Sequence, residues 1–299
     1  DNYEQDLSKT LNEYKKISEL DTALLQELGV DYESVRTGVK EKLFGYRNVY
    51  WNLLFEHLDA LSSRLTKRNK ETLLNTLKSN ALDCTYTNAT YVVSFAVEMA
   101  NELIESSMIE VYQSLTSEKS ILRHFKSNTH MFNDRWRHNG NDNSKAKYIL
   151  DYRFVSSHYS NFSSYNHTLN DSARDFTNDL MVVFRLLGYS HIIPAVELNT
   201  IEAGNSLLVR GNEPSGKRVD LVKIRYYKNG NRHISFNQEA MLRFNVTVSR
   251  VLGWVRSRDD FDAEAQSSAP TRDDIWAVSD GLKVSASSVA LALTHQQAA

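Results

Sequence analysis

Residues that interrupt helices and strands are scarce in this sequence. Its 299 residues include only 3 prolines and 11 glycines, and both counts lie below average usage. Because Gly and Pro are the strongest local breakers, their scarcity predicts long uninterrupted elements and a bias towards helix. Hydrophobic residues make up 41% and charged residues 24% of the chain, which are ordinary globular values and exclude wholesale disorder.

The first two thirds of the chain have helical periodicity. Apolar residues recur at three- and four-residue steps over residues 1–30, which predicts an acidic amphipathic helix ending at Gly29. Further helices are expected at 34–66, at 68–80 and from a cap at Thr87 or Asn88 to about residue 126, with a brief strand at 82–86. A helix capped by Asn170 or Asp171 and stopped by Gly188 follows. We therefore expect an acidic helical arm at 1–30 and a mainly helical body at 31–189.

Strand patterns begin after residue 190. Strands are expected at 206–210, 218–228 and 231–236, and Asn229-Gly230 predicts a two-residue turn with positive φ at both central positions. Asn237 is a good N-cap for a closing helix. The predicted class is α+β: a mostly helical N-terminal body with a small C-terminal antiparallel hairpin-plus-helix module at 190–256.

Residues 257–299 form a polar C-terminal extension with few large apolar side chains. A segment of this composition becomes ordered only by packing on its own domain or on a partner. Ile275 and Trp276 are the candidate anchors on a partner, and residues 289–293 offer a second apolar group.

Charge is strongly segregated along the chain although the formal net charge is only −2. Residues 205–258 hold eleven Lys or Arg against three acids, a charge of +8, and residues 259–299 carry −5. A basic segment interleaved with Tyr226, Tyr227 and Trp254 fits a nucleic-acid backbone. It fits equally the basic half of a protein–protein interface, or a solvated face. The candidate binding residues are Lys217, Arg218, Lys223, Arg225, Lys228, Arg232, Arg243 and Arg250.

The sequence shows no motif of a known catalytic centre. The segment 211–218 nearly spells a phosphate-binding loop, but Arg218 stands where that loop needs Ser or Thr. We expect no catalytic residues, no metal site and no cofactor. Cys84 is the sole cysteine and no apolar run is long enough to span a membrane, so we expect a cytoplasmic protein that does not bind membranes.

The C-terminal module resembles a bacterial and phage domain family of unknown function. Tyr227-Lys-Asn-Gly-Asn-Arg-His-Ile-Ser-Phe236 resembles the family's hairpin, and the helix from Glu239 to Trp254, with Asn245-Val and Gly253-Trp254, resembles its closing helix. Phe132-Asn-Asp-Arg-Trp136 and the helix at 171–188 add weaker support. The family occurs alone in mobile elements or attached to adenine-N6 DNA methyltransferases, so the resemblance implies a context of DNA modification or defence. At class level the chain is also similar to phage anti-defence proteins such as inhibitors of the Gabija nuclease–ATPase.

Three functions remain as hypotheses. The first is a non-enzymatic phage or mobile-element protein that binds and inhibits a host DNA-targeting defence complex of the nuclease/ATPase type, as a homo-oligomer. The second is a nucleic-acid-binding accessory protein, with DNA as the partner, associated with DNA methylation and restriction–modification. The third is an enzyme whose site is assembled only in three dimensions.

Overall fold

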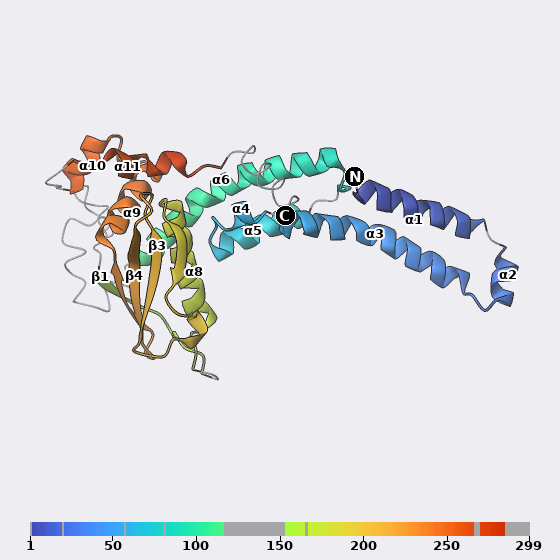
Figure 1. Ribbon diagram of the computed structural model, residues 1–299, viewed down its shortest axis with the longest axis horizontal. Coiled ribbons are helices and arrows are strands. Elements are labelled where there is room, and N and C mark those ends of the chain that lie inside the picture. Colours follow the sequence, from blue (N-terminus) through green and yellow to red (C-terminus); the bar gives the residue numbers. More distant parts are fainter. Residues whose placement is uncertain are drawn as a thin grey trace. The chain divides into compact units, whose positions relative to one another are not determined.

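The computed structural model describes residues 2–19, 21–56, 58–79, 82–116, 153–164, 167–265 and 270–284. The chain divides into two compact units (Figure 1). Unit 1 comprises residues 1–62, 71–100 and 285–299, and unit 2 comprises residues 63–70 and 101–284. This division differs from the expected one, because the first 62 residues fall in one unit and the expected 31–189 body is shared between the two.

Helices are the only regular elements in the described residues of unit 1. Its first helix packs along the third: the Tyr50 hydroxyl donates to Asp6 at 2.6 Å, and the hydroxyls of Thr10 and Tyr46 lie 3.1 Å apart. Trp51 is buried and donates its indole N–H to the Leu82 carbonyl at 2.8 Å. The elements that contribute to this unit are α1 (Asn2–Ser18), α2 (Thr22–Glu27), α3 (Tyr32–Glu56), α4 (Asp59–Ser62), α5 (Lys67–Lys78) and α6 (Tyr86–Thr116).

Unit 2 contains a five-stranded antiparallel sheet with the order β1-β5-β4-β3-β2. Consecutive strands from β2 to β5 are neighbours, and β1 pairs with the free edge of β5. The strands are β1 (Arg153–Ser157), β2 (Ser190–Pro194), β3 (Ser206–Asn212), β4 (Arg218–Tyr226) and β5 (Asn231–Phe236). The other elements are α8 (Asp171–Leu186), η3 (Leu198–Thr200), α9 (Gln238–Val251), α10 (Arg258–Ala265), α11 (Asp273–Trp276) and η4 (Ala277–Gly281).

One face of the sheet carries the core, and α8 covers it (Figure 1). The Tyr226 hydroxyl lies 2.6 Å from the Thr177 hydroxyl of α8, and the rings of Phe184 and Phe236 are 6.0 Å apart. The apolar core residues that the strands contribute are Leu207, Val209, Leu221, Val222, Ile224, Tyr226, Ile234 and Phe236. Such an alternation of buried and exposed positions is typical of an antiparallel sheet with one covered face.

A β-bulge interrupts the pairing of β3 with β4. Val209 pairs with Val222 and Arg210 pairs with Asp220, so Leu221 is the extra residue. Leu221 and Val222 are consecutive, yet both are buried. Gly211, which pairs with Val219, leaves room for the bulged side chain, since a Cβ there would lie 2.7 Å from the Leu221 Cδ1.

Helix α9 is enclosed by other parts of unit 2. Phe244 packs edge-to-face against Tyr112 of α6, with ring centroids 5.5 Å apart. On another side, Val246 joins a buried cluster with Val255, Phe261 and Ile275. Residues 253–265 and 270–284 therefore continue the fold by covering a helix that is buried over nine of its residues.

The structure confirms the α+β class and several element boundaries. Strand β5 has the predicted bounds, Asn170 caps α8, and Asn237 accepts hydrogen bonds from the N–H groups of Glu239 and Ala240 at the start of α9. The expected helix over 1–30 is instead two, because Asp21 caps a separate α2. The predicted strand at 82–86 is wrong: Tyr86 already begins α6, which runs without a break to Thr116. The expected extension of that helix to residue 126 lies outside the described residues.

The predicted two-residue turn between β4 and β5 is also wrong. Tyr227 N–H donates to the Asn231 carbonyl at 3.0 Å, and Gly230 N–H donates to the Tyr227 carbonyl at 3.1 Å. These bonds enclose a three-residue loop in which only Gly230 has positive φ, at 86°. Loops of this kind pair an ordinary turn with a glycine bulge, so Asn229 needs no left-handed conformation.

Candidate functional site

The face of the sheet opposite α8 is polar and basic, and we call it the open face. Strand register places on it Arg210 from β3, the four charged residues of β4, and His233 from β5. The charged residues of β4 are Arg218, Asp220, Lys223 and Arg225, and all four are exposed.

Charges on the open face are only partly neutralised. Arg210 Nε lies 3.0 Å from the Asp220 carboxylate in an exposed ion pair. Arg225 Nε donates to the Ser206 hydroxyl at 3.3 Å, which orients the guanidinium without cancelling its charge. Among the residues that the structure describes, neither Lys223 nor Arg225 forms an ion pair. These two cations are therefore available to an anionic ligand.

An aromatic pair lies beside these cations. The Tyr227 and His233 rings are 4.7 Å apart, and His233 pairs across the strands with Arg225. Partial burial, and then the neighbouring Arg225 charge, lower the pKa of His233. His233 is thus neutral at pH 7 and adds a stacking surface rather than a charge.

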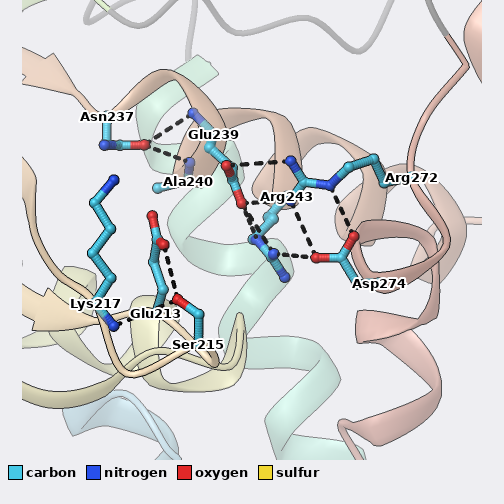
Figure 2. Close-up of polar contacts among 9 residues, drawn as sticks. All are labelled: Glu213, Ser215, Lys217, Asn237, Glu239, Ala240, Arg243, Arg272 and Asp274. Carbon is cyan, nitrogen blue, oxygen red and sulfur yellow. Dashed lines mark hydrogen bonds and ion pairs between the residues drawn. The ribbon is translucent and has the colours of Figure 1, made fainter.

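Three further candidates lie at the ends of the β4 hairpins. Lys217 and Arg218 are exposed at the β3–β4 loop, which is closed by the Glu213 N–H donating to the Lys217 carbonyl at 2.8 Å. Ser215 stabilises the same loop by donating to Glu213, as Figure 2 shows. Lys228 is exposed in the β4–β5 loop. Five of the eight predicted binding residues are therefore accessible along β4 and at its two ends.

Arg232 does not belong to this surface, and its inclusion was wrong. It alternates onto the core face of β5 and has an exposed fraction of 0%. Its Nε donates to the Asn161 Oδ1 at 2.7 Å, and its guanidinium carbon lies 4.6 Å from the Phe176 ring centroid. The sequence pattern concealed this position because a charged residue on a strand is normally exposed.

Arg243 is also unavailable, because acids of the same unit occupy it (Figure 2). It is 3% exposed and contacts Glu239 at 3.1 Å and Asp274 at 2.6 Å. Arg272 joins the group by contacting Glu239 at 2.7 Å and Asp274 at 3.0 Å. We call these four residues the α9 clamp. Hydrogen bonding to Arg272, followed by Arg243, lowers the pKa of Asp274 to about 2.

Arg250, in the last turn of α9, is also paired with an acid of its own unit. It contacts Asp280 at 2.9 Å, and its guanidinium carbon lies 4.5 Å from the Trp276 ring. Ile275 is 1% exposed within the cluster that contains Val246, Val255 and Phe261, and Trp276 packs against the same cluster. The expected anchors on a partner thus pack on their own chain, while residues 289–293 lie outside the described residues.

The basic segment therefore divides into two groups with different surroundings. The cations of α9 are neutralised by acids of residues 273–280, whereas those of β4 and its flanking loops remain exposed. Sequence reasoning missed that Arg210 and His233 share a face with Lys223 and Arg225. The hairpin at 227–231 contained the signal, because fixing its register places residue 233 opposite residue 225.

Within the described residues, no three His, Cys, Asp or Glu side chains are grouped in a way that could hold a metal ion. No described helix is long and apolar enough to cross a membrane. His158 is largely buried, and burial followed by the Arg232 charge lowers its pKa to about 4.

Comparison with known families identifies one relationship. A family model described as "Domain of unknown function (DUF4942)" matches residues 46–254, which is more than half of the chain. The chain belongs to the DUF4942 family. The match begins within α3, spans the following helices, the open face and all of α9, and ends at Trp254, before α10 and α11. No curated protein and no solved structure is significantly similar to the chain.

Proposed function

We propose that this protein binds nucleic acid through the open face and acts without catalysis. The observation that supports this proposal most strongly is the exposed position of Lys217, Arg218, Lys223, Arg225 and Lys228 on β4 and the loops that flank it. None of these five forms an ion pair within the described part of the chain. Release of condensed counterions by such residues supplies most of the affinity of non-specific nucleic-acid binding.

The aromatic pair favours a single strand over a duplex. Sheet faces that bind single strands combine cations that follow the backbone with rings on which bases stack. Lys223 and Arg225 are two residues apart on one strand, about 7 Å along its axis, and Tyr227 and His233 lie beside them. Backbone contacts together with stacking predict weak sequence preference.

Fluorescence anisotropy with labelled single-stranded and duplex DNA of equal length tests this proposal. If about five phosphates are neutralised, log affinity should fall with log salt with a slope of about −3.5 for a single strand. The double variant Lys223→Glu and Arg225→Glu should reduce the steepness of that slope by about 1.4 and weaken binding to all sequences alike. Arg256→Glu and Lys283→Glu, which change the charge equally at exposed positions off the sheet, are the matched control.

Absence of binding at low salt would refute the proposal, and so would an equal loss in the control variant. The finer proposal, that binding serves DNA methylation or restriction–modification, rests on the family context that the resemblance implies. A DNA methyltransferase assayed with and without this protein on the same substrate tests it, and an unchanged methylation rate would count against it.

A second candidate function rests on unit 1. This unit exposes large apolar side chains on α2, at its C-cap and on α3, which suits contact with a protein or with a second copy of the chain. The exposed fractions are 50% for Leu24, 67% for Leu28, 74% for Phe44 and 53% for Val49. This feature supports the hypothesis of a phage or mobile-element inhibitor that binds a host defence complex as a homo-oligomer.

Two measurements test this second candidate. Light scattering after size-exclusion chromatography measures the mass in solution for the wild type and for the Leu28→Ser, Phe44→Ser double variant. Co-purification with a defined nuclease–ATPase defence complex, combined with phage plating on cells that carry it, tests inhibition. A monomeric wild type that neither binds the complex nor protects phage would refute the hypothesis.

A further inference from the structure

Arg232 is a buried cation with an incomplete set of partners. Its exposed fraction is 0%, and its Nε donates to the Asn161 Oδ1 at 2.7 Å. The two terminal nitrogens, Nη1 and Nη2, are buried and donate to no described group. The four N–H bonds of these two nitrogens thus have no acceptor in the structure, and two of them lie parallel on the edge that Nη1 and Nη2 share.

This arrangement is costly unless a further group is present. Burial lowers the pKa of Arg232 to about 10, so the side chain still carries its charge at neutral pH. A buried, unpaired charge strongly destabilises a protein interior. No carboxylate of the described residues forms an ion pair with Arg232. The Phe176 and Tyr226 rings, 4.6 Å and 5.6 Å from its guanidinium carbon, contact its faces and leave the donor edge unsatisfied.

The surrounding residues hold the guanidinium in one orientation. The Asn161 side-chain amide donates to the carbonyls of Tyr227 at 3.0 Å and Asn231 at 2.9 Å, so its oxygen is fixed towards Arg232. Asn161 itself is completely buried. Because the Nε bond and the aromatic contact define both the plane and the direction of the guanidinium, its free edge is pre-organised for a planar acceptor.

A second unpartnered polar group lies on the strand that pairs with β5. Ser156 of β1 is the direct cross-strand neighbour of Arg232 in the register of β1 with β5. Its side chain is 2% exposed, and its hydroxyl also has no partner in the structure. Side chains directly opposite each other in an antiparallel pair have Cβ atoms about 5 Å apart. One small group between them could accept from both.

We propose that Arg232 and Ser156 form an enclosed binding site for a small oxoanion, one carboxylate- or phosphate-type group. Two parallel N–H donors match the two oxygens of such a group, and the serine hydroxyl supplies a third hydrogen bond. A water molecule could accept from the same edge but would not compensate the charge. His158 suits the site because it is neutral at pH 7, which avoids placing a proton donor of like charge beside Arg232.

The site does not depend on the proposed nucleic-acid interface. Arg232 lies on the core face of the sheet beneath α8, whereas Lys223 and Arg225 lie on the opposite face. Loss of nucleic-acid binding would leave the oxoanion site intact, and the reverse also holds. Because the site is enclosed, we expect slow exchange and retention of the anion during purification.

Thermal unfolding of the full chain tests the site, with sodium phosphate, sodium sulfate and sodium acetate compared against sodium chloride at matched ionic strength. We expect one of the oxoanions to raise the apparent midpoint by about 5 °C at a concentration about 100 times its dissociation constant. Phosphate and sulfate acting alone would indicate a tetrahedral anion, and acetate acting alone would indicate a carboxylate. Native mass spectrometry should show an added mass that is lost on denaturation.

Two variants connect the effect to the site. Arg232→Gln should abolish the oxoanion-specific shift, while Arg256→Gln, an equal charge change at an exposed position, should retain it. If Arg232→Gln does not fold, Ser156→Ala keeps the guanidinium and should weaken oxoanion binding about five- to tenfold. Oxoanions that stabilise the wild type no more than chloride, or equal shifts in the wild type and Ser156→Ala, would overturn the proposal.

Discussion

Gly230 allows a close approach between two backbone segments, and replacing it by alanine should be unusually destabilising. Gly230 has a φ of 86°, and a Cβ there would lie 1.8 Å from the His158 carbonyl oxygen. The obstacle is backbone, so no side-chain rotation can relieve it. The same contact includes a hydrogen bond of 3.0 Å from the His158 N–H to the Gly230 carbonyl.

The expected cost has two parts that a matched control separates. A left-handed φ costs a non-glycine residue about 1–2 kcal/mol. Displacing the 158–161 segment removes the His158 hydrogen bond and disturbs those of Asn161, which adds about 2–3 kcal/mol. We therefore expect about 4 kcal/mol for Gly230→Ala. Gly216→Ala, at a φ of 85° with no atom within 4 Å of the new Cβ, should cost only the first part, about 1 kcal/mol.

Urea denaturation followed by far-UV circular dichroism measures both variants. Because the chain divides into two compact units, hydrogen exchange of the β4 and β5 amides should confirm that the loss lies in unit 2. In a thermal scan of the same variants, the apparent midpoint of Gly230→Ala should fall by about 10 °C. Equal losses for Gly230→Ala and Gly216→Ala would show that the backbone contact adds nothing and would refute the reasoning.

Three further predictions concern α9 and the segment that covers it. Asn237→Ala removes the acceptor for the Glu239 and Ala240 N–H groups and should cost about 1 kcal/mol in urea denaturation. The pKa of Asp274 is lowered to about 2 from an ordinary 3.8, so its ionised form stabilises the fold. This contribution is complete above about pH 4 and is lost as the pH falls towards 2. Acid titration of the wild type and of Asp274→Asn, followed by tryptophan fluorescence, should show the difference. Ile275→Ala should cost about 3 kcal/mol and increase proteolysis of residues 253–284, because this side chain is 1% exposed.

Local signals in the sequence predicted much of unit 2. The Asn237 cap, the Asn170 cap and the bounds of β5 depend on neighbouring residues, and each was confirmed. The accessibility of the basic residues could not be predicted in the same way. Whether Arg243 is free or paired depends on Asp274, which is 31 residues away, and no periodicity in either segment records that contact.

The same limit applies to Arg232. Alternation along β5 would place residues 232, 234 and 236 on one face, and two of these are apolar, so the pattern contained evidence that Arg232 points inwards. The contacts that stabilise the buried Arg232 side chain come from Asn161 and Phe176, which lie in distant segments of the chain. A count of charges along the chain treats such a residue as exposed. The charge of +8 for residues 205–258 therefore overstated the charge that is accessible.

The bulge at Leu221 determines which side of the sheet receives charge. In a regular strand, residues of even and odd number face opposite sides. Arg218 and Asp220 are even, Lys223 and Arg225 are odd, and the extra residue between the two pairs reverses this parity once. Deleting Leu221 would restore strict alternation and force one pair of charges into the core. A single inserted residue therefore keeps all the charged side chains of β4 on one side of the sheet.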